Sequence, residues 1–166
     1  MGLKNTMKTS GFLVKLHKEG KLEIVDPSDN ICESYLHKSE SHFDSAKILF
    51  TSEKLEECIS MAYYGMYHSL VALLFKCGIK SENHTASILL LKALFNEDSL
   101  AKDFNFAKKE RIDKQYYTDF KITKADSKDM INKAENSIIK IKLIIKRLDK
   151  EKINQLRDTL NKSLPK

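Results

Sequence analysis

An aromatic run near the middle of the chain carries the first side chains that can do chemistry. Residues 62–68 read AYYGMYH, and Tyr64 and His68 are four positions apart, so that they share one face of a helix beside its apolar stripe. Such a face can stack on a base or hold a phosphate. In the alternative interpretation, the aromatic rings fill a helix–helix interface and His68 hydrogen-bonds to a neighbouring helix.

A second histidine, His84, precedes the next predicted helix. A histidine at this position can cap the helix or meet an anion at its N-terminal end. The alternative is an ordinary loop or capping role without catalysis.

A third cluster combines an arginine with two tyrosines in the segment RIDKQYYTDF, residues 111–120. Arg111 offers a bidentate fork to a phosphate, and Tyr116 or Tyr117 can stack on a base or hydrogen-bond to an oxyanion. Alternatively, Arg111 pairs with a nearby carboxylate at the surface and the tyrosines pack. An aromatic pair inside a polar helix requires some partner in either case.

Several familiar kinds of site are missing from the sequence. It has no glycine-rich phosphate loop, no HExxH and no G-x-S-x-G, and its carboxylates are dispersed. The three cysteines, an odd number without metal-ligand spacing, favour reduced thiols in the core. We therefore expect no metal and no cofactor.

Apolar residues recur at helical spacing through most of the chain, and five glycines and two prolines leave few breaks. A short helix should end at Gly20, and an extended stretch should follow it. The periodicity predicts long helices over residues 30–51, 52–77, 85–96, 100–120 and 123–148, and it allows the last one to continue to residue 163.

Helix-start signals accompany two of these helices. Ser28 or Asp29 can cap the helix that begins near residue 30, and Thr51 or Ser52, with a glutamate at 56 or 57, resembles a capping box for the next one. The polarity of residues 100–120 suggests a surface helix. Short loops then predict an all-α fold, an antiparallel bundle of four to five helices with a short N-terminal extension.

Charge is distributed unevenly along the 166 residues, a length that suits one domain. Residues 1–123 carry 17 basic and 17 acidic residues, whereas residues 124–166 carry 12 and 6, the whole net charge of +6. This basic arm is either a phosphate-attracting segment or a solvated helix face. No signal peptide and no apolar run near 18 residues is evident, so we expect a cytoplasmic protein without membrane contact.

The motifs together resemble the HEPN-domain family. The run AYYGMYHSLVALLFKCGIKSENHTA is similar to the family's central signature, an aromatic run with a histidine, a glycine, and a histidine before the next helix. FLVKLHKEGKLEIVDPSDNICESYLHKSESHFDSAKILF, RIDKQYYTDF and DSKDMINKAENSIIKIKLII resemble the flanking segments of one branch of small proteins. The resemblance predicts an N-terminal extension at 1–29, a helical bundle at 30–150 and a basic C-terminal helix extension at 151–166.

The resemblance implies a homodimer that is often paired with a minimal nucleotidyltransferase protein, within toxin–antitoxin systems. Catalytic members carry an arginine followed, four to six residues later, by a histidine, and two copies of this motif form an RNA-cleaving site. Here Arg111 is present, but Tyr116 and Tyr117 occupy the positions where the histidine is expected. Tyrosine, with a pKa near 10, is a poor general base at pH 7, whereas histidine titrates near 6.5.

Three functions are therefore open. The first is a non-catalytic module that dimerises and binds a nucleotidyltransferase, RNA or a nucleotide. The second is a metal-independent ribonuclease toxin with a divergent site of Arg111, Tyr117 and a histidine from elsewhere in the fold. The third is a purely structural bundle. The resemblance also implies that a partner enzyme can nucleotidylate a tyrosine near the motif, for which Tyr116 and Tyr117 are the candidates.

Overall fold

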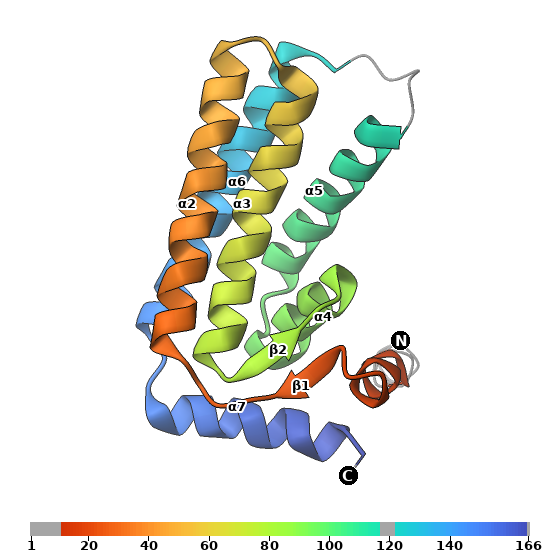
Figure 1. Cartoon of the computed structure of the whole chain (residues 1–166), viewed down its shortest axis with the longest axis vertical. Helices are drawn as coiled ribbons and strands as arrows, with labels where there is room; N and C mark the ends of the chain where they lie inside the picture. Colours follow the sequence, from red (N-terminus) through yellow and green to blue (C-terminus); the bar gives the residue numbers. More distant parts are fainter. Residues whose placement is uncertain (1–10, 117–121, 166) are drawn as a thin grey trace.

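The computed structural model describes residues 11–116 and 122–165 and has an all-α architecture with one small two-stranded sheet (Figure 1). This confirms the predicted fold class. Residues 11–18 are helical. The further elements are, in order, β1 (Leu22–Ile24), α2 (Asp29–Thr51), α3 (Leu55–Lys76), β2 (Ile79–Ser81), α4 (His84–Phe95), α5 (Asp98–Tyr116), α6 (Lys124–Lys146) and α7 (Lys150–Ser163).

Helix α3 is the centre of the molecule and contacts α2, α4, α5 and α6. Most of its side chains are buried. Among the described residues, α3 is the one helix long and apolar enough to cross a membrane; the sequence predicted its length but not an apolar run of that extent. Because 72% of its most apolar window is buried inside the bundle, and core helices pass the same test, this is weak evidence for a span.

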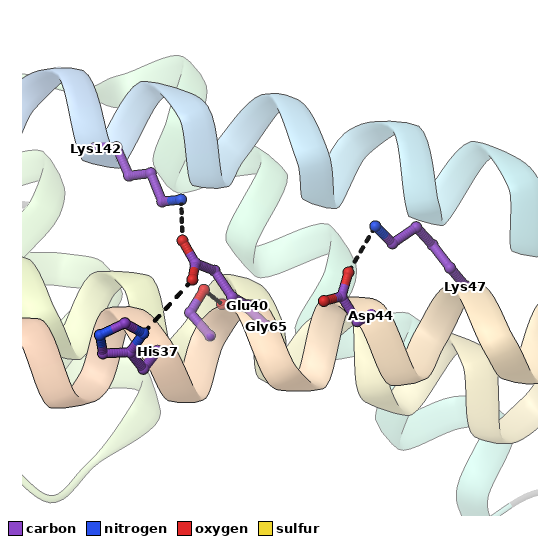
Figure 2. A network of polar contacts seen from close by, with 7 residues as sticks. His37, Glu40, Asp44, Lys47, Gly65 and Lys142 are labelled. Atoms are coloured by element: carbon purple, nitrogen blue, oxygen red, sulfur yellow. Dashed lines mark hydrogen bonds and ion pairs between the residues drawn. The ribbon is translucent and has the colours of Figure 1, made fainter.

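A close approach between α2 and α3 sets the position of the aromatic run. A β-carbon on Gly65 would lie 3.3 Å from the backbone and side chain of Phe43, so glycine allows the two helices to pack tightly. The hydroxyl of Ser39, which is fully buried, donates to the carbonyl of Gly65 at 2.6 Å. Figure 2 shows, beside this contact, how Glu40 of α2 reaches Lys142 of α6, with 2.6 Å between the charged atoms. These contacts fix α2 against both α3 and α6.

The two strands form an antiparallel pair in which Leu22 lies opposite Ser81 and Ile24 opposite Ile79. The extended stretch at β1 was predicted, but its partner β2 was not. Gly78 connects α3 to β2 with φ of +68°, in the left-handed region that favours glycine. The turn thus brings the chain from α3 back to the N-terminal segment and onward to His84.

Helix α7 crosses the lower end of the bundle in Figure 1 and does not continue the direction of α6. The chain leaves the helix at Arg147, and Asp149 caps α7 by accepting a hydrogen bond from the amide of Lys152. Its apolar face packs into the core through Ile153, Leu156 and Leu160. The expected extension of the fifth helix to residue 163 is therefore wrong, because a new N-terminal cap begins a separate helix.

Other boundaries need smaller corrections. The capping box at Thr51 and Ser52 is wrong: Lys54 is the N-cap of α3, without a side-chain bond, and Ser52 ends α2 instead. By contrast, Ser28 caps α2 as predicted, since its hydroxyl accepts from the amide of Ile31. Helix α5 begins at Asp98 and lies at the surface as predicted, with one face exposed and one buried; the buried face consists of Leu100, Ala101, Phe104 and Ala107.

The three cysteines are buried and unpaired, which confirms their prediction as core thiols. Burial raises the pKa of Cys58 to about 11 and that of Cys77 to about 12. Both side chains therefore remain protonated thiols near neutral pH, and thiolate chemistry is disfavoured.

Candidate functional site

Helix α3 presents its aromatic run on two adjoining faces. Tyr63 and Tyr67 are buried, whereas Tyr64 and His68 are half-buried at the edge of the core. The four-residue spacing that predicted a shared face for Tyr64 and His68 is confirmed by their rings, whose centroids lie 6.2 Å apart with an interplanar angle of 23°. The interpretation of the aromatic rings as interface packing also holds for the buried pair.

Arg111 reaches this run from α5, as Nη1 of its guanidinium donates to the hydroxyl of Tyr64 at 3.2 Å. The guanidinium carbon also lies 5.4 Å from the ring centroid of Tyr63 and 5.6 Å from that of Tyr64, within the range of cation–π attraction. Two residues that were singled out separately in the sequence thus meet in the fold.

His84 joins the same group from the start of α4, where it is the first helical residue; the helix was predicted to begin one residue later. Its Nδ1 lies 2.5 Å from the hydroxyl of Tyr63, and its ring stacks on Tyr67 at 3.7 Å between centroids. Burial, together with the charges of Arg111 and Lys108, lowers the pKa of His84 to about 4. His84 is therefore neutral at pH 7.

Lys108 and Thr85 complete the group, and the sequence analysis identified neither. Nζ of Lys108 donates to the hydroxyl of Thr85 at 2.5 Å, and burial together with Arg111 lowers the pKa of this lysine. Two cations of α5 thus lie close enough to repel each other beside His84. Lys108 and Arg111 are three positions apart on a helix, a spacing that could have pointed to a shared face.

His68 faces α2 rather than this cationic group. Its ring lies 4.7 Å from that of His42 and 5.9 Å from that of Tyr35, so it contacts a neighbouring helix as the packing interpretation predicts. Its Nδ1, however, is buried without a hydrogen-bond partner among the described residues, so the predicted hydrogen bond is not formed at that atom. Burial lowers the pKa of His68 to about 4, and His42 and Lys38 add to the effect.

The side chains of the two tyrosines beyond Arg111 fall outside the described part of the structure. Tyr116 is the last residue of α5, and its side chain lies outside the described part of the structure. Tyr117 itself lies outside the described residues, so its predicted catalytic role remains a prediction. The described residues also contain no group of three or more His, Cys, Asp or Glu side chains able to hold a metal ion.

The described members of the group have the chemistry of a phosphate site. Arg111 and Lys108 supply positive charge, while Tyr64, His84 and Thr85 supply polar atoms next to it. A hollow of about 210 Å³ beside Lys108 is lined by residues of α5 alone and does not include Arg111, Tyr64 or His84. Arginine and lysine are the side chains that proteins use most for phosphate, and partial burial strengthens their attraction for an anion.

Comparison with known proteins identifies the fold and its relatives. The HEPN domain matches residues 32–159, most of the chain. The chain belongs to the HEPN family. A UPF0332 protein of Archaeoglobus fulgidus is 30% identical over 65% of this chain and 95% of its own length. A Methanocaldococcus jannaschii protein named "Putative toxin" is 26% identical over 70% of this chain and 90% of its own length. A UPF0332 protein of Thermotoga maritima is 24% identical over 75% of this chain and 98% of its own length.

Within this HEPN chain, the imidazole nearest to Arg111 comes from a different element than the one expected. Resemblance placed a histidine four to six residues after the arginine, on the same segment. The structure instead brings His84 of α4 into the electrostatic field of Arg111, 27 residues apart in the sequence. Arg111, Tyr64 and His84, three of the candidate residues, therefore form one group, while His68 extends it toward α2.

Proposed function

We propose that this HEPN protein is a toxin-like module that binds a phosphate-bearing ligand, RNA or a nucleotide, through Arg111, Lys108 and His84. The convergence of the two cations on a partly buried aromatic wall carries the proposal. Lys108 has no carboxylate partner among the described residues, and its lowered pKa reflects burial and repulsion by Arg111. A bound phosphate would relieve that repulsion. The relative named "Putative toxin" supports the toxin-like part of the proposal.

The experiment is to incubate the purified protein with a labelled tRNA pool and with total cellular RNA, without metal, and to measure both binding and cleavage. Arg111→Ala and Lys108→Ala should each weaken tRNA binding by about tenfold, since a charge-assisted hydrogen bond contributes roughly 1.5–3 kcal/mol. Lys102→Ala removes the same charge from an exposed position earlier on α5, outside the hollow beside Lys108, and should leave affinity within about twofold. Equal losses in the lysine variants would refute a localised site.

Ribonuclease activity is the second candidate, because His84 lies near Arg111 in the folded protein. The same incubation decides between the two functions. Cleavage that disappears in Arg111→Ala would make the protein an enzyme with a histidine supplied by α4. Intact RNA, with binding that depends on Arg111, would support a binding module. A purely structural role predicts that neither variant changes any binding.

We further propose, from the family resemblance, a homodimer with a minimal nucleotidyltransferase as its partner. Light scattering during size-exclusion chromatography should give twice the chain mass of 19.1 kDa. Co-expression with a neighbouring nucleotidyltransferase gene, where one exists, should yield a complex that survives purification. A monomer that binds neither this partner nor RNA would contradict this proposal.

A further inference from the structure

The contact between Tyr63 and His84 is the most constrained one in the cluster. Tyr63 is fully buried in the middle of α3, and the 2.5 Å distance joins its hydroxyl to Nδ1 of His84 at the start of α4. Burial raises the pKa of Tyr63 above its ordinary value, and the charge of Tyr67 would add to this effect. Both partners are therefore neutral at pH 7, so one proton lies between the two atoms.

The environment of Tyr63 indicates which atom carries that proton. A buried hydroxyl that leaves its own proton without an acceptor loses about 1–3 kcal/mol. Within the described part of the chain, Nδ1 of His84 is the one hydrogen-bond partner found for this hydroxyl. If the Tyr63 hydroxyl donates to Nδ1, its proton has an acceptor. If Nδ1 of His84 donates instead, the hydroxyl proton of Tyr63 has no acceptor. The tautomer of His84 that accepts at Nδ1 carries its proton on Nε2.

Stacking holds the ring in this orientation. The imidazole of His84 lies almost parallel to the ring of Tyr67, with 3.7 Å between centroids and an interplanar angle of 9°. The ring centroid of Tyr63 lies farther away, at 5.7 Å from that of His84. A flip of the imidazole would exchange Nδ1 for a carbon beside the Tyr63 hydroxyl, so the two tyrosines define one ring orientation.

We infer that Tyr63 is a positioning residue: its hydroxyl fixes His84 as a neutral imidazole with the proton on Nε2, and His84 thereby becomes a hydrogen-bond donor for the ligand phosphate. The identity of the ligand rests on the proposed function, but the tautomer does not. In this arrangement Lys108 and Arg111 supply the charge and His84 supplies a directional, uncharged donor. The lone pair of Nε2 that a general base would use is occupied by the proton.

The charged and titratable groups around His84 favour the same state from both neighbouring helices. Arg111 and Lys108 of α5 disfavour the imidazolium, and Tyr63 and Tyr67 of α3 are neutral at pH 7. No carboxylate contributes to the shift of His84. The neutral donor should therefore persist across the physiological pH range.

Nitrogen-15 NMR of the free, full-length protein tests the inference directly, with His84→Gln used to assign the His84 signals. At pH 7, Nε2 should be protonated and Nδ1 unprotonated. Tyr63→Phe should produce a mixture of tautomers and move the pKa of His84 upward, because the donor to the neutral form is lost. Tyr67→Phe is the matched control, since it removes a hydroxyl from α3 but keeps the stacked ring. A proton on Nδ1 in the wild-type protein would overturn the inference, and so would an unchanged tautomer in Tyr63→Phe.

Binding of the labelled tRNA pool provides the second readout. Tyr63→Phe should weaken binding about fivefold, while Tyr67→Phe should change it less than twofold. If wild-type protein binds tRNA through Arg111 but NMR finds the proton on Nδ1, the inference fails and the proposed function stands. If wild-type protein binds neither tRNA nor a nucleotide, the proposed function fails, and NMR of the free protein still decides the role of Tyr63.

Discussion

His68 and His84 are the two histidines whose surroundings disfavour the charged imidazolium. Burial is the main cause for both and lowers each pKa to about 4. The smaller contributions differ, since Arg111 and Lys108 act on His84 whereas His42 and Lys38 act on His68. Both side chains are half-buried, so solvent screening reduces the energy that these shifts represent.

A dependence of stability on pH follows from these two residues. In the unfolded chain, His68 and His84 bind protons near pH 6.5. In the folded chain, these two side chains do so only near pH 4. The free energy of unfolding should therefore be unaffected by these residues above pH 6.5 and decrease as the pH falls from 6.5 toward 4. Urea denaturation at pH 7.5, 5.5 and 4.5 measures the slope. The double variant His68→Gln/His84→Gln should have a shallower slope than His37→Gln, which alters an exposed histidine. Equal slopes would contradict the prediction.

Individual site residues could be predicted from the sequence where chemistry and local spacing were enough. Tyr64 and His68 share a helix face because of a four-residue interval, and Arg111 is recognisable by its chemistry beside tyrosines. Lys108 and Thr85 were missed because their contact joins α5 to α4, 23 residues apart. Long-range pairing of this kind leaves no local pattern, and the role of Tyr63 is hidden for the same reason.

At the scale of elements, one arginine of α7 adds polar contacts to the apolar packing of this helix against the core. The guanidinium of Arg157 donates to the carbonyls of Val25, Cys77 and Gly78, which flank the two short strands. Since the first strand precedes α2 and the second leads to α4, this contact joins three distant segments of the chain. The position of His84 therefore depends on the order of β2, which Arg157 supports.

Arg157→Ala should lower the free energy of unfolding by about 2 kcal/mol, because buried carbonyls lose charge-assisted partners. Arg157→Lys should recover only part of this, since Nη1 makes all three contacts and the shorter lysine side chain places its ammonium elsewhere. Urea denaturation measures the loss of stability. Amide hydrogen exchange in Arg157→Ala should increase most, relative to the wild-type protein, in α7 and in residues 22–25. Arg147→Ala removes an exposed arginine just after α6 and should change stability by less than about 0.5 kcal/mol. If Arg147→Ala lowers the free energy of unfolding as much as Arg157→Ala does, the effect comes from the change in net charge and not from the contacts of Arg157.

Periodicity predicted the long helices because each presents a continuous apolar stripe to the core. It failed where an element was too short or a break carried no special residue. β1 and β2 both have three residues, but residues 21–24 alternate polar and apolar around β1, whereas no such alternation surrounds β2. The break between α6 and α7 contains neither glycine nor proline, and the apolar positions of both helices continue across it, so only the cap at Asp149 marks the new start.

For the whole molecule, the distribution of charge has a structural as well as a chemical meaning. All of the net charge of +6 comes from residues 124–166, which form α6 and α7. The apolar face of α7 is buried against the bundle, and its lysines at 150, 152 and 162 are exposed. The basic arm is thus a folded element with a solvated face, whereas the proposed phosphate site lies on α3, α4 and α5 in the neutral part of the sequence.

Salt dependence of tRNA binding can separate these two sources of positive charge. Each phosphate contact that is lost should reduce the slope of log affinity against log salt concentration by roughly 0.7–0.9. Lys108→Ala should therefore flatten the slope by about this amount and lower affinity at every salt concentration. The triple variant Lys150→Gln/Lys152→Gln/Lys162→Gln removes three charges from α7, yet it should change affinity less than twofold at about 0.15 M salt, where charges more than about 8 Å from a phosphate are screened. If the triple variant instead loses as much affinity and slope as Lys108→Ala, α7 is part of the binding surface, and the ligand must extend from the Arg111 cluster to the lower end of the bundle.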